Sequence, residues 1–240
     1  MPESFSTRRS FLVQTSIAGA GLLAPIAAAQ QKPDSDKKEG DKAKGNEGIS
    51  PAEDLMREHG VLNRVLLIYD HHLQLLAEKR PFDGSILAGS ADIIRHFVEE
   101  YHEKLEEDFL FPRFRKAKKL VSLVDTLQAQ HKAGRDLTAK IRELAATATL
   151  KYVSTDSDNL ADALRSFLRM YRPHEAREDT VLFPAFRTIV SAHEYDALGD
   201  DFEKKEDELF GDEGFFKVVE QVAELEKKLG IYDLAQFTPR

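Results

Sequence analysis

The chain is 240 residues long and 42% of its residues are hydrophobic, which is enough to bury one sizeable core. Its net charge of −8 argues against a general affinity for nucleic acid or for anionic membranes, since both need clustered positive charge. Because cysteine is absent, disulfides and cysteine-held iron–sulfur clusters are excluded, and any bound metal must be held by nitrogen and oxygen donors.

Residues 1–29 have the features of an export signal. Arg8 and Arg9 precede an apolar stretch of small residues, as in a twin-arginine signal peptide, and the run of alanines ending at Ala29 suits a signal peptidase. Glycine and proline within the stretch favour a cleaved signal over a permanent membrane span. We therefore expect cleavage after Ala29 and a periplasmic or otherwise exported protein.

Residues 30–49 are almost entirely polar or charged, and this composition predicts a disordered linker. The first helix should begin directly after the linker, because Ser50 can cap it, Pro51 suits its first position and Glu53 can complete a capping box. We expect this helix to run to about Lys79, ahead of the next proline.

Apolar periodicity and breaking residues predict three more long helices and two shorter ones. The second long helix should open near Ser85 and end at the Phe111–Pro112 boundary, and the fourth should be kinked at Pro173 and Pro184. The third long helix is expected over 121–148, the fourth from about Asp158 toward His174, and the two shorter ones over 192–210 and 213–229.

The second and fourth helices carry the same pair of potential metal ligands. His102 and Glu106 stand four residues apart, and His174 and Glu178 repeat the pair further along the chain. Four residues turn an α-helix by about 400°, so each histidine and its glutamate project from one helix face. Each face can therefore present two ligands to a metal.

Single histidines on the first and third helices extend this internal repeat. The interval from His59 to His131 equals the interval between the two His-x-x-x-Glu pairs, so each single histidine precedes its pair by the same number of residues. In both helix pairs the ligands lie at similar distances from the connecting turn, as side chains that meet across antiparallel helices must. The sequence thus predicts an all-α, antiparallel up-down four-helix bundle over residues 50–190, with C-terminal helices after it and six ligands at one level: His59, His102, Glu106, His131, His174 and Glu178.

Four imidazoles and two carboxylates suit iron, manganese or zinc better than calcium or magnesium, which prefer oxygen ligands. Shared between two ions, this set allots two histidines to each ion and leaves Glu106 and Glu178 free to bridge them. Such sharing leaves open positions where dioxygen, peroxide, nitric oxide or water can bind.

The chain resembles the bacterial hemerythrin-like, HHE cation-binding domains over residues 50–190. The segments that carry the resemblance are LMREHG, YHEKLEEDFLFP, QHKAGRD and PHEAREDTVLFP. The resemblance implies a non-haem pair of iron ions with an oxo or hydroxo bridge, in preference to manganese or zinc. It also implies oxygen binding, iron or oxygen sensing, nitric-oxide responses or peroxide breakdown, among which the fold does not choose.

Two positions depart from the oxygen-carrying hemerythrins. Those proteins have a second histidine four residues after the third-helix histidine, where this chain has Arg135. They also place an aspartate five residues after the fourth-helix histidine, and Asp179 stands there beside Glu178. We favour Glu178 as the ligand because its angle matches His174 on a straight helix, whereas a kink at Pro173 would turn Asp179 inward.

Other polar side chains near the pattern have simpler interpretations. Tyr171 lies one turn before His174 and could donate a hydrogen bond within the site, although a packed core tyrosine is the more common case. The phenylalanines after each ligand pair are expected to pack between helices. The remaining histidines point away from the ligand faces and are expected at the surface or rim: His71, His72, His96 and His193.

These features favour an exported di-iron protein that binds or reduces a small oxidant, such as dioxygen, peroxide or nitric oxide. A non-catalytic iron-binding or redox-sensing module is the alternative, and catalytic turnover distinguishes the two. The sequence does not identify a protein redox partner.

Overall fold

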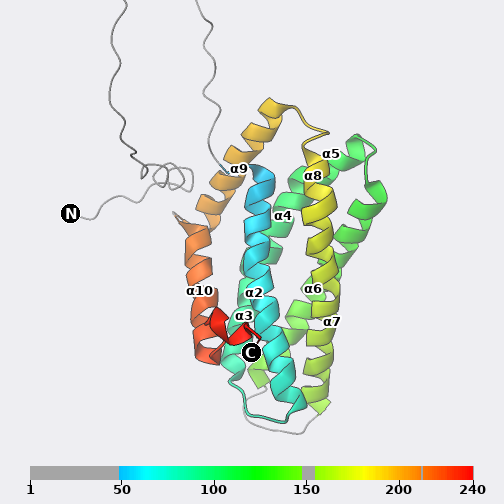
Figure 1. Cartoon of the computed structure of the whole chain (residues 1–240). Helices are drawn as coiled ribbons and strands as arrows, with labels where there is room; N and C mark the ends of the chain where they lie inside the picture. The colour runs from blue at the N-terminus through cyan, green and yellow to red at the C-terminus, as the bar shows by residue number, and fades with distance from the viewer. Residues whose placement is uncertain (1–48, 148–154, 212, 240) are drawn as a thin grey trace, which may run out of the picture. The chain divides into compact units, whose positions relative to one another are not determined.

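The computed structural model describes residues 49–147, 155–211 and 213–239, and within these ranges the regular structure is helical without a strand (Figure 1). The predicted all-α fold is therefore confirmed. The predicted signal peptide and nearly all of the predicted linker lie outside the described residues. Among the helices that are described, none is both long and apolar enough to cross a membrane.

Four long rods form the bundle. Helix α2 packs against α3 and α7, and α6 also packs against α3 and α7, so the four rods close a ring around a common core. The rods are α2 (Pro51–Ala77); α3 (Gly84–Ile93) continued by η2 (Ile94–His102), α4 (Glu103–Leu105), η3 (Glu106–Leu110) and α5 (Phe111–Lys116); α6 (Val121–Thr147); and α7 (Thr155–Arg177) continued by η4 (Glu178–Leu182) and α8 (Phe183–Phe186).

The first rod begins where the sequence predicts. The Ser50 side chain accepts a hydrogen bond from the backbone N–H of Glu53 at 3.3 Å, and Pro51 occupies the first helical turn. Backbone N–H groups in the first turn of a helix have no partner within the helix. Ser50 binds one of them and Pro51 has none, which stabilises the helix start. The rod ends at Ala77, two residues before the predicted Lys79.

The second and fourth rods contain π-helical turns that begin at the two candidate glutamates. The N–H of Phe111 donates to the carbonyl of Glu106, and that of Phe183 donates to the carbonyl of Glu178, each five residues back. A proline follows each of these phenylalanines and cannot donate to the carbonyl four residues before it, so the wider turn accommodates the proline within the rod. The predicted helix end at Phe111–Pro112 is therefore wrong, because the rod continues to Lys116.

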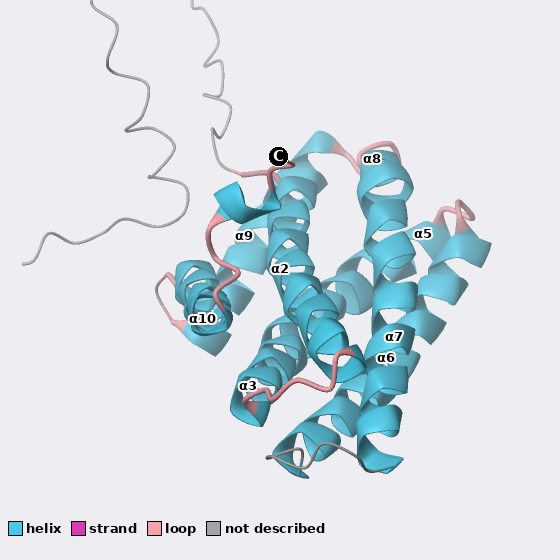
Figure 2. Cartoon of the chain, turned by 60° about the horizontal axis from the view of Figure 1, so that its bottom comes forward, coloured by secondary structure: helices cyan, strands magenta, loops and turns pink. Residues whose placement is uncertain are grey.

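The C-terminal helices cover the side of α2 that faces away from α6 and α7, as both overall views show (Figures 1 and 2). They are α9 (Ala192–Phe210) and α10 (Gly214–Leu229), followed by the short η5 (Leu234–Phe237). Helix α9 packs against α2 and η2, and α10 packs against α2 and α3. A salt bridge from Arg64 Nη2 of α2 to Glu226 Oε2 of α10, 2.5 Å long, adds a polar tie.

Candidate metal centre

All six side chains singled out in the sequence meet inside the bundle. Two overlapping clusters bring their ligand atoms within 4.8 Å of one another: Glu106, His131, His174 and Glu178 in one, and His59, His102 and Glu178 in the other. None of the six residues is more than 4% exposed. The four rods therefore place the candidate ligands at one level, in a dry interior.

The carboxylates of Glu106 and Glu178 lie between two pairs of histidines, His59 with His102 and His131 with His174. Glu178 places Oε1 3.1 Å from Nε2 of His174 and Oε2 3.4 Å from Nε2 of His59. Glu106 places Oε2 3.3 Å from Nε2 of His131 and 3.9 Å from Nε2 of His102. Each glutamate thus lies within 4.0 Å of at least one histidine of each pair, as a carboxylate that bridges two ions must.

The donor set fits a metal pair. The carboxylate oxygens of Glu106 and Glu178, and Nε2 of His131, are buried and make no hydrogen bond of normal geometry within the described residues. Buried polar atoms without such bonds are costly and rare in proteins, and a coordinated cation would satisfy all of them at once. Their convergence is the physical reason to expect metal here.

A second layer of acceptors orients two of the histidine rings. Nδ1 of His102 lies 2.8 Å from Oε2 of Glu58, and Nδ1 of His174 lies 2.9 Å from Oε1 of Gln130. A hydrogen bond from Nδ1 selects the tautomer whose Nε2 carries the free lone pair, which is the atom that faces the centre. Sequence reasoning missed both acceptors, although they directly precede His59 and His131 in the repeat.

The other two histidines are held from across the bundle. Nδ1 of His59 lies 2.7 Å from Oδ1 of Asp179, and Nδ1 of His131 lies 3.2 Å from Oε1 of Glu107. The Asp179 side chain is 35% exposed, whereas the Glu178 side chain is fully buried at the centre. This geometry favours Glu178 as the ligand and gives Asp179 the task of orienting His59.

Aromatic rings support the same histidines in both halves. Phe183 stacks on His59 at a centroid distance of 5.6 Å, and Phe111 stacks on His131 at 5.4 Å. With Phe114 and Phe186, these rings are buried in the core, as the sequence predicts for packing residues. The phenylalanine after each His-x-x-x-Glu pair therefore also limits the freedom of a histidine on another rod.

Arg135 supplies a fixed cation at the position where oxygen-carrying hemerythrins have a histidine. Its Nη2 lies 2.8 Å from Oε2 of Glu103 and 2.7 Å from Oε1 of Glu107. Tyr171 donates its hydroxyl hydrogen to Oε1 of Glu103 at 2.8 Å, so the phenol has a hydrogen-bond partner outside the six candidate ligands. The packed-tyrosine interpretation of Tyr171 therefore agrees with the structure.

Gly134 makes room for the Tyr171 ring, since a Cβ atom at this position would lie 2.8 Å from Cζ and closer still to the hydroxyl oxygen. We expect Gly134→Ala to destabilise the protein by about 1–3 kcal/mol, as overpacking in a core does, although alanine favours helix. Urea unfolding measures the change. In a Tyr171→Leu background the clash is removed, so Gly134→Ala should then be neutral or stabilising; equal destabilisation in both backgrounds would contradict the steric explanation.

The two candidate bridging residues, Glu106 and Glu178, have different pKa values. Burial and repulsion from Glu178 together raise the pKa of Glu106 to about 8. Burial also acts to raise the pKa of Glu178, but His174 and His59 hold it well below its usual range. In the metal-free protein Glu106 therefore keeps its proton to a higher pH than Glu178 does.

The pKa values of the histidines also differ from one another. Burial acts to lower the pKa of His131, but its contacts with Glu106 and Glu107 raise it to about 10. His59 behaves alike, because Asp179 and Glu178 overcome burial and raise its pKa well above the usual value. Burial and the charge of His59 lower the pKa of His102 well below that value. Protons thus occupy the places where a cation would bind.

The remaining histidines lie outside the centre, but one prediction about them is wrong. His72, expected at the surface or rim, is fully buried, and its Nδ1 lies 2.8 Å from the carbonyl oxygen of Ile68. It faces Phe82 in the turn after α2, a contact that helical angle alone did not reveal. His96 and His193 are exposed, as expected.

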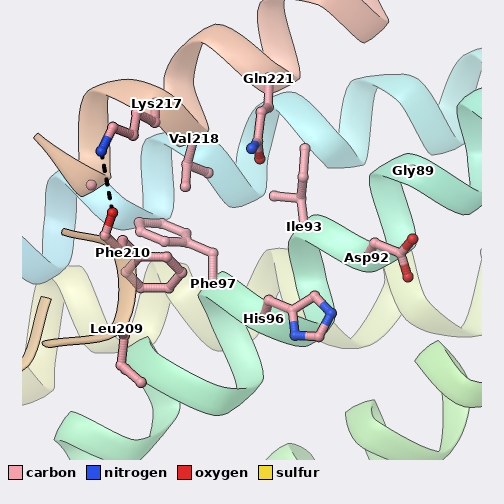
Figure 3. A pocket seen from close by; sticks show the side chains of 11 residues that line it. Gly89, Asp92, Ile93, His96, Phe97, Leu209, Phe210, Lys217, Val218 and Gln221 are labelled. Carbon is pink, nitrogen blue, oxygen red and sulfur yellow. Dashed lines mark hydrogen bonds between the residues drawn. The ribbon is translucent and has the colours of Figure 1, made fainter.

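A cavity of about 480 Å³ lies between α3 and η2 on one side and the C-terminal helices on the other (Figure 3). Phe97, Phe210 and Val218 line its apolar part, and Lys217 at its edge donates from Nζ to the carbonyl oxygen of Phe210 at 3.3 Å. Its lining residues include none of the six candidate ligands, so it is separate from the centre.

Comparisons with known proteins agree with this geometry. The family model described as hemerythrin HHE cation binding domain matches residues 50–186, and matches again over 122–237. An uncharacterized protein of Mycobacterium bovis and uncharacterized proteins of two Mycobacterium tuberculosis strains are each 43% identical over 232 residues, which cover 96% of this chain and 91% of the relative. No solved structure matches the chain.

Proposed function

Because the chain belongs to the hemerythrin HHE cation-binding family, we propose that its buried centre binds two iron ions and acts on a small oxidant. The observation that carries the proposal is the convergence of four histidines and two carboxylates whose oxygens lack hydrogen bonds of normal geometry within the described residues. A structural zinc site would close its shell with four ligands, whereas two ions sharing six side chains keep positions open.

Each candidate ligand has a distinct task in this proposal. Nε2 of His59 and His102 would hold one ion, Nε2 of His131 and His174 the other, and Glu106 and Glu178 would bridge them. Bound iron would supply electrons and open positions for dioxygen, peroxide or nitric oxide. Burial of the centre excludes bulk water, and the acceptors behind the histidines keep each Nε2 directed inward.

Metal content and turnover test the proposal together. We expect the purified chain to hold two iron ions, and a His102→Ala, His174→Ala double variant to lose them, as elemental analysis and the optical spectrum would record. The reduced protein should then consume peroxide, dioxygen or nitric oxide over many cycles. A folded chain that takes up no iron would refute the metal pair.

A non-catalytic sensing module is the second candidate, and the packing of the C-terminal helices favours it specifically. Glu206 of α9 lies within 4.8 Å of Glu58, the residue that holds His102. A change at the centre therefore has a short path to α9. Stoichiometric, reversible binding of the oxidant, with altered hydrogen exchange in α9 and α10, would support sensing over turnover.

Export through the twin-arginine route is part of the same proposal. It is supported by the paired arginines, the apolar stretch and the alanines that end at Ala29. N-terminal sequencing of the exported protein should begin just after Ala29. An intact Met1 on the mature protein would refute cleavage, and Arg8→Lys, Arg9→Lys should leave the chain in the cytoplasm.

A further inference from the structure

The outer hydrogen bonds of the centre follow the internal repeat of the sequence. Glu58 holds His102 in one half, and its counterpart Gln130, one repeat later, holds His174 in the other. Glu107 and Asp179 are counterparts in the same way, and they hold His131 and His59. In both halves of the repeat, therefore, the histidines are supported at Nδ1 by residues at the same positions of the repeat.

One pair of counterparts differs in charge. Glu58 offers a carboxylate and Gln130 an amide oxygen, yet the two bonds are 2.8 and 2.9 Å long, so the geometry is matched. Asp179 and Glu107, by contrast, are both carboxylates. A carboxylate accepts the Nδ1 hydrogen more strongly than an amide does, which makes the opposite Nε2 a better donor to a cation.

Glu58, the carboxylate of this pair, is also more deeply buried than Gln130. Glu58 is 1% exposed, and one of its carboxylate oxygens lies within 4.8 Å of a carboxylate oxygen of Asp54 and of one of Glu206 on α9. Glu206 in turn accepts from the N–H of Phe215 at 2.7 Å, at the start of α10. Gln130 is only partly buried. Because electrostatic differences are larger away from water, the burial of Glu58 increases the difference between its carboxylate and the amide of Gln130 as acceptors.

From these differences we propose that the two metal positions are unequal, and that Glu58 makes the position of His59 and His102 the tighter one. The inference rests on the proposed metal pair and goes beyond it, because it ranks the two positions and names the cause. Glu58 acts through His102 as a positioning residue and is not itself a ligand. The position of His131 and His174 would therefore fill second and empty first.

Stepwise titration of the metal-free full chain with Co²⁺, in competition with a chelator, measures the ranking. We expect two equivalents whose Kd values differ by about 10–100-fold, the usual effect of an outer-shell partner. Glu58→Gln should weaken the first equivalent, and Gln130→Glu should strengthen the second, so each variant brings the two Kd values together. Ala129→Glu, which adds the same charge at an exposed neighbouring position, should leave both unchanged.

The charge-neutral exchange Glu58→Gln with Gln130→Glu gives the sharpest result. It should restore two separated affinities in reversed order. Removing one histidine reports the order: His174→Ala should leave the tight equivalent in the natural chain and the weak one in the exchanged chain, and His102→Ala should do the opposite. Equal Kd values in the natural chain, or an unchanged order after the exchange, would overturn the ranking alone. A folded chain that binds no Co²⁺ would overturn the metal pair as well.

Discussion

Replacing Glu178 by alanine should reduce bound iron to near zero, whereas replacing Asp179 should only weaken binding. Glu178 belongs to both ligand clusters, so its loss removes a donor from each ion. Asp179 contacts the outer nitrogen of His59, and loss of such a partner costs about 10–100-fold in metal affinity. Elemental analysis at limiting and at excess iron separates a lost site from a weakened one.

Two further variants serve as controls for this comparison. Glu178→Gln keeps the size of the side chain and should fold where alanine leaves a cavity, while still losing most of the metal. Glu175→Gln is a nearby carboxylate change at a residue that accepts from Asn63 and lies outside both ligand clusters. It should retain both ions. Full iron binding by Glu178→Ala, with loss in Asp179→Ala, would reverse the assignment of the two residues.

Metal affinity should rise steeply with pH, because the centre must release protons before it can bind a cation. The pKa of Glu106 is raised to about 8 and that of His131 to about 10, so the metal-free centre holds protons at neutral pH. The pKa of His59 is raised as well. Each proton displaced makes Kd fall about tenfold per pH unit, so between pH 6 and 8 Kd should fall about 100-fold if one proton is displaced and about 10,000-fold if two are.

The sign and shape of this dependence are specific. Above pH 8 Glu106 has already lost its proton, so the slope should decrease there while His131 still contributes up to about pH 10. Anaerobic Fe²⁺ titrations at constant ionic strength, with proton release recorded on a pH-stat, measure both quantities. His96→Ala removes an exposed histidine outside the centre and should leave the slope unchanged. A Kd independent of pH would show that the metal displaces no protons.

The helical bundle and the residues at its centre could be predicted from patterns in the sequence alone. Two periodicities were sufficient: the spacing of four places a histidine and a glutamate on one helix face, and the internal repeat matches His59 and His102 with His131 and His174. The Ser50 cap was equally readable, because capping depends on residues within one turn.

The side chains that support the ligands could be identified only in the folded chain. Glu58, Gln130 and Glu107 reach histidines on other rods, and no local pattern reports a contact between residues 24 to 44 positions apart. The turn that carries a rod through Pro112 and the burial of His72 likewise depend on hydrogen bonds and packing that helical angles do not encode. Local geometry selects the candidate ligands, whereas the strength of each depends on which neighbour the folded chain places behind it.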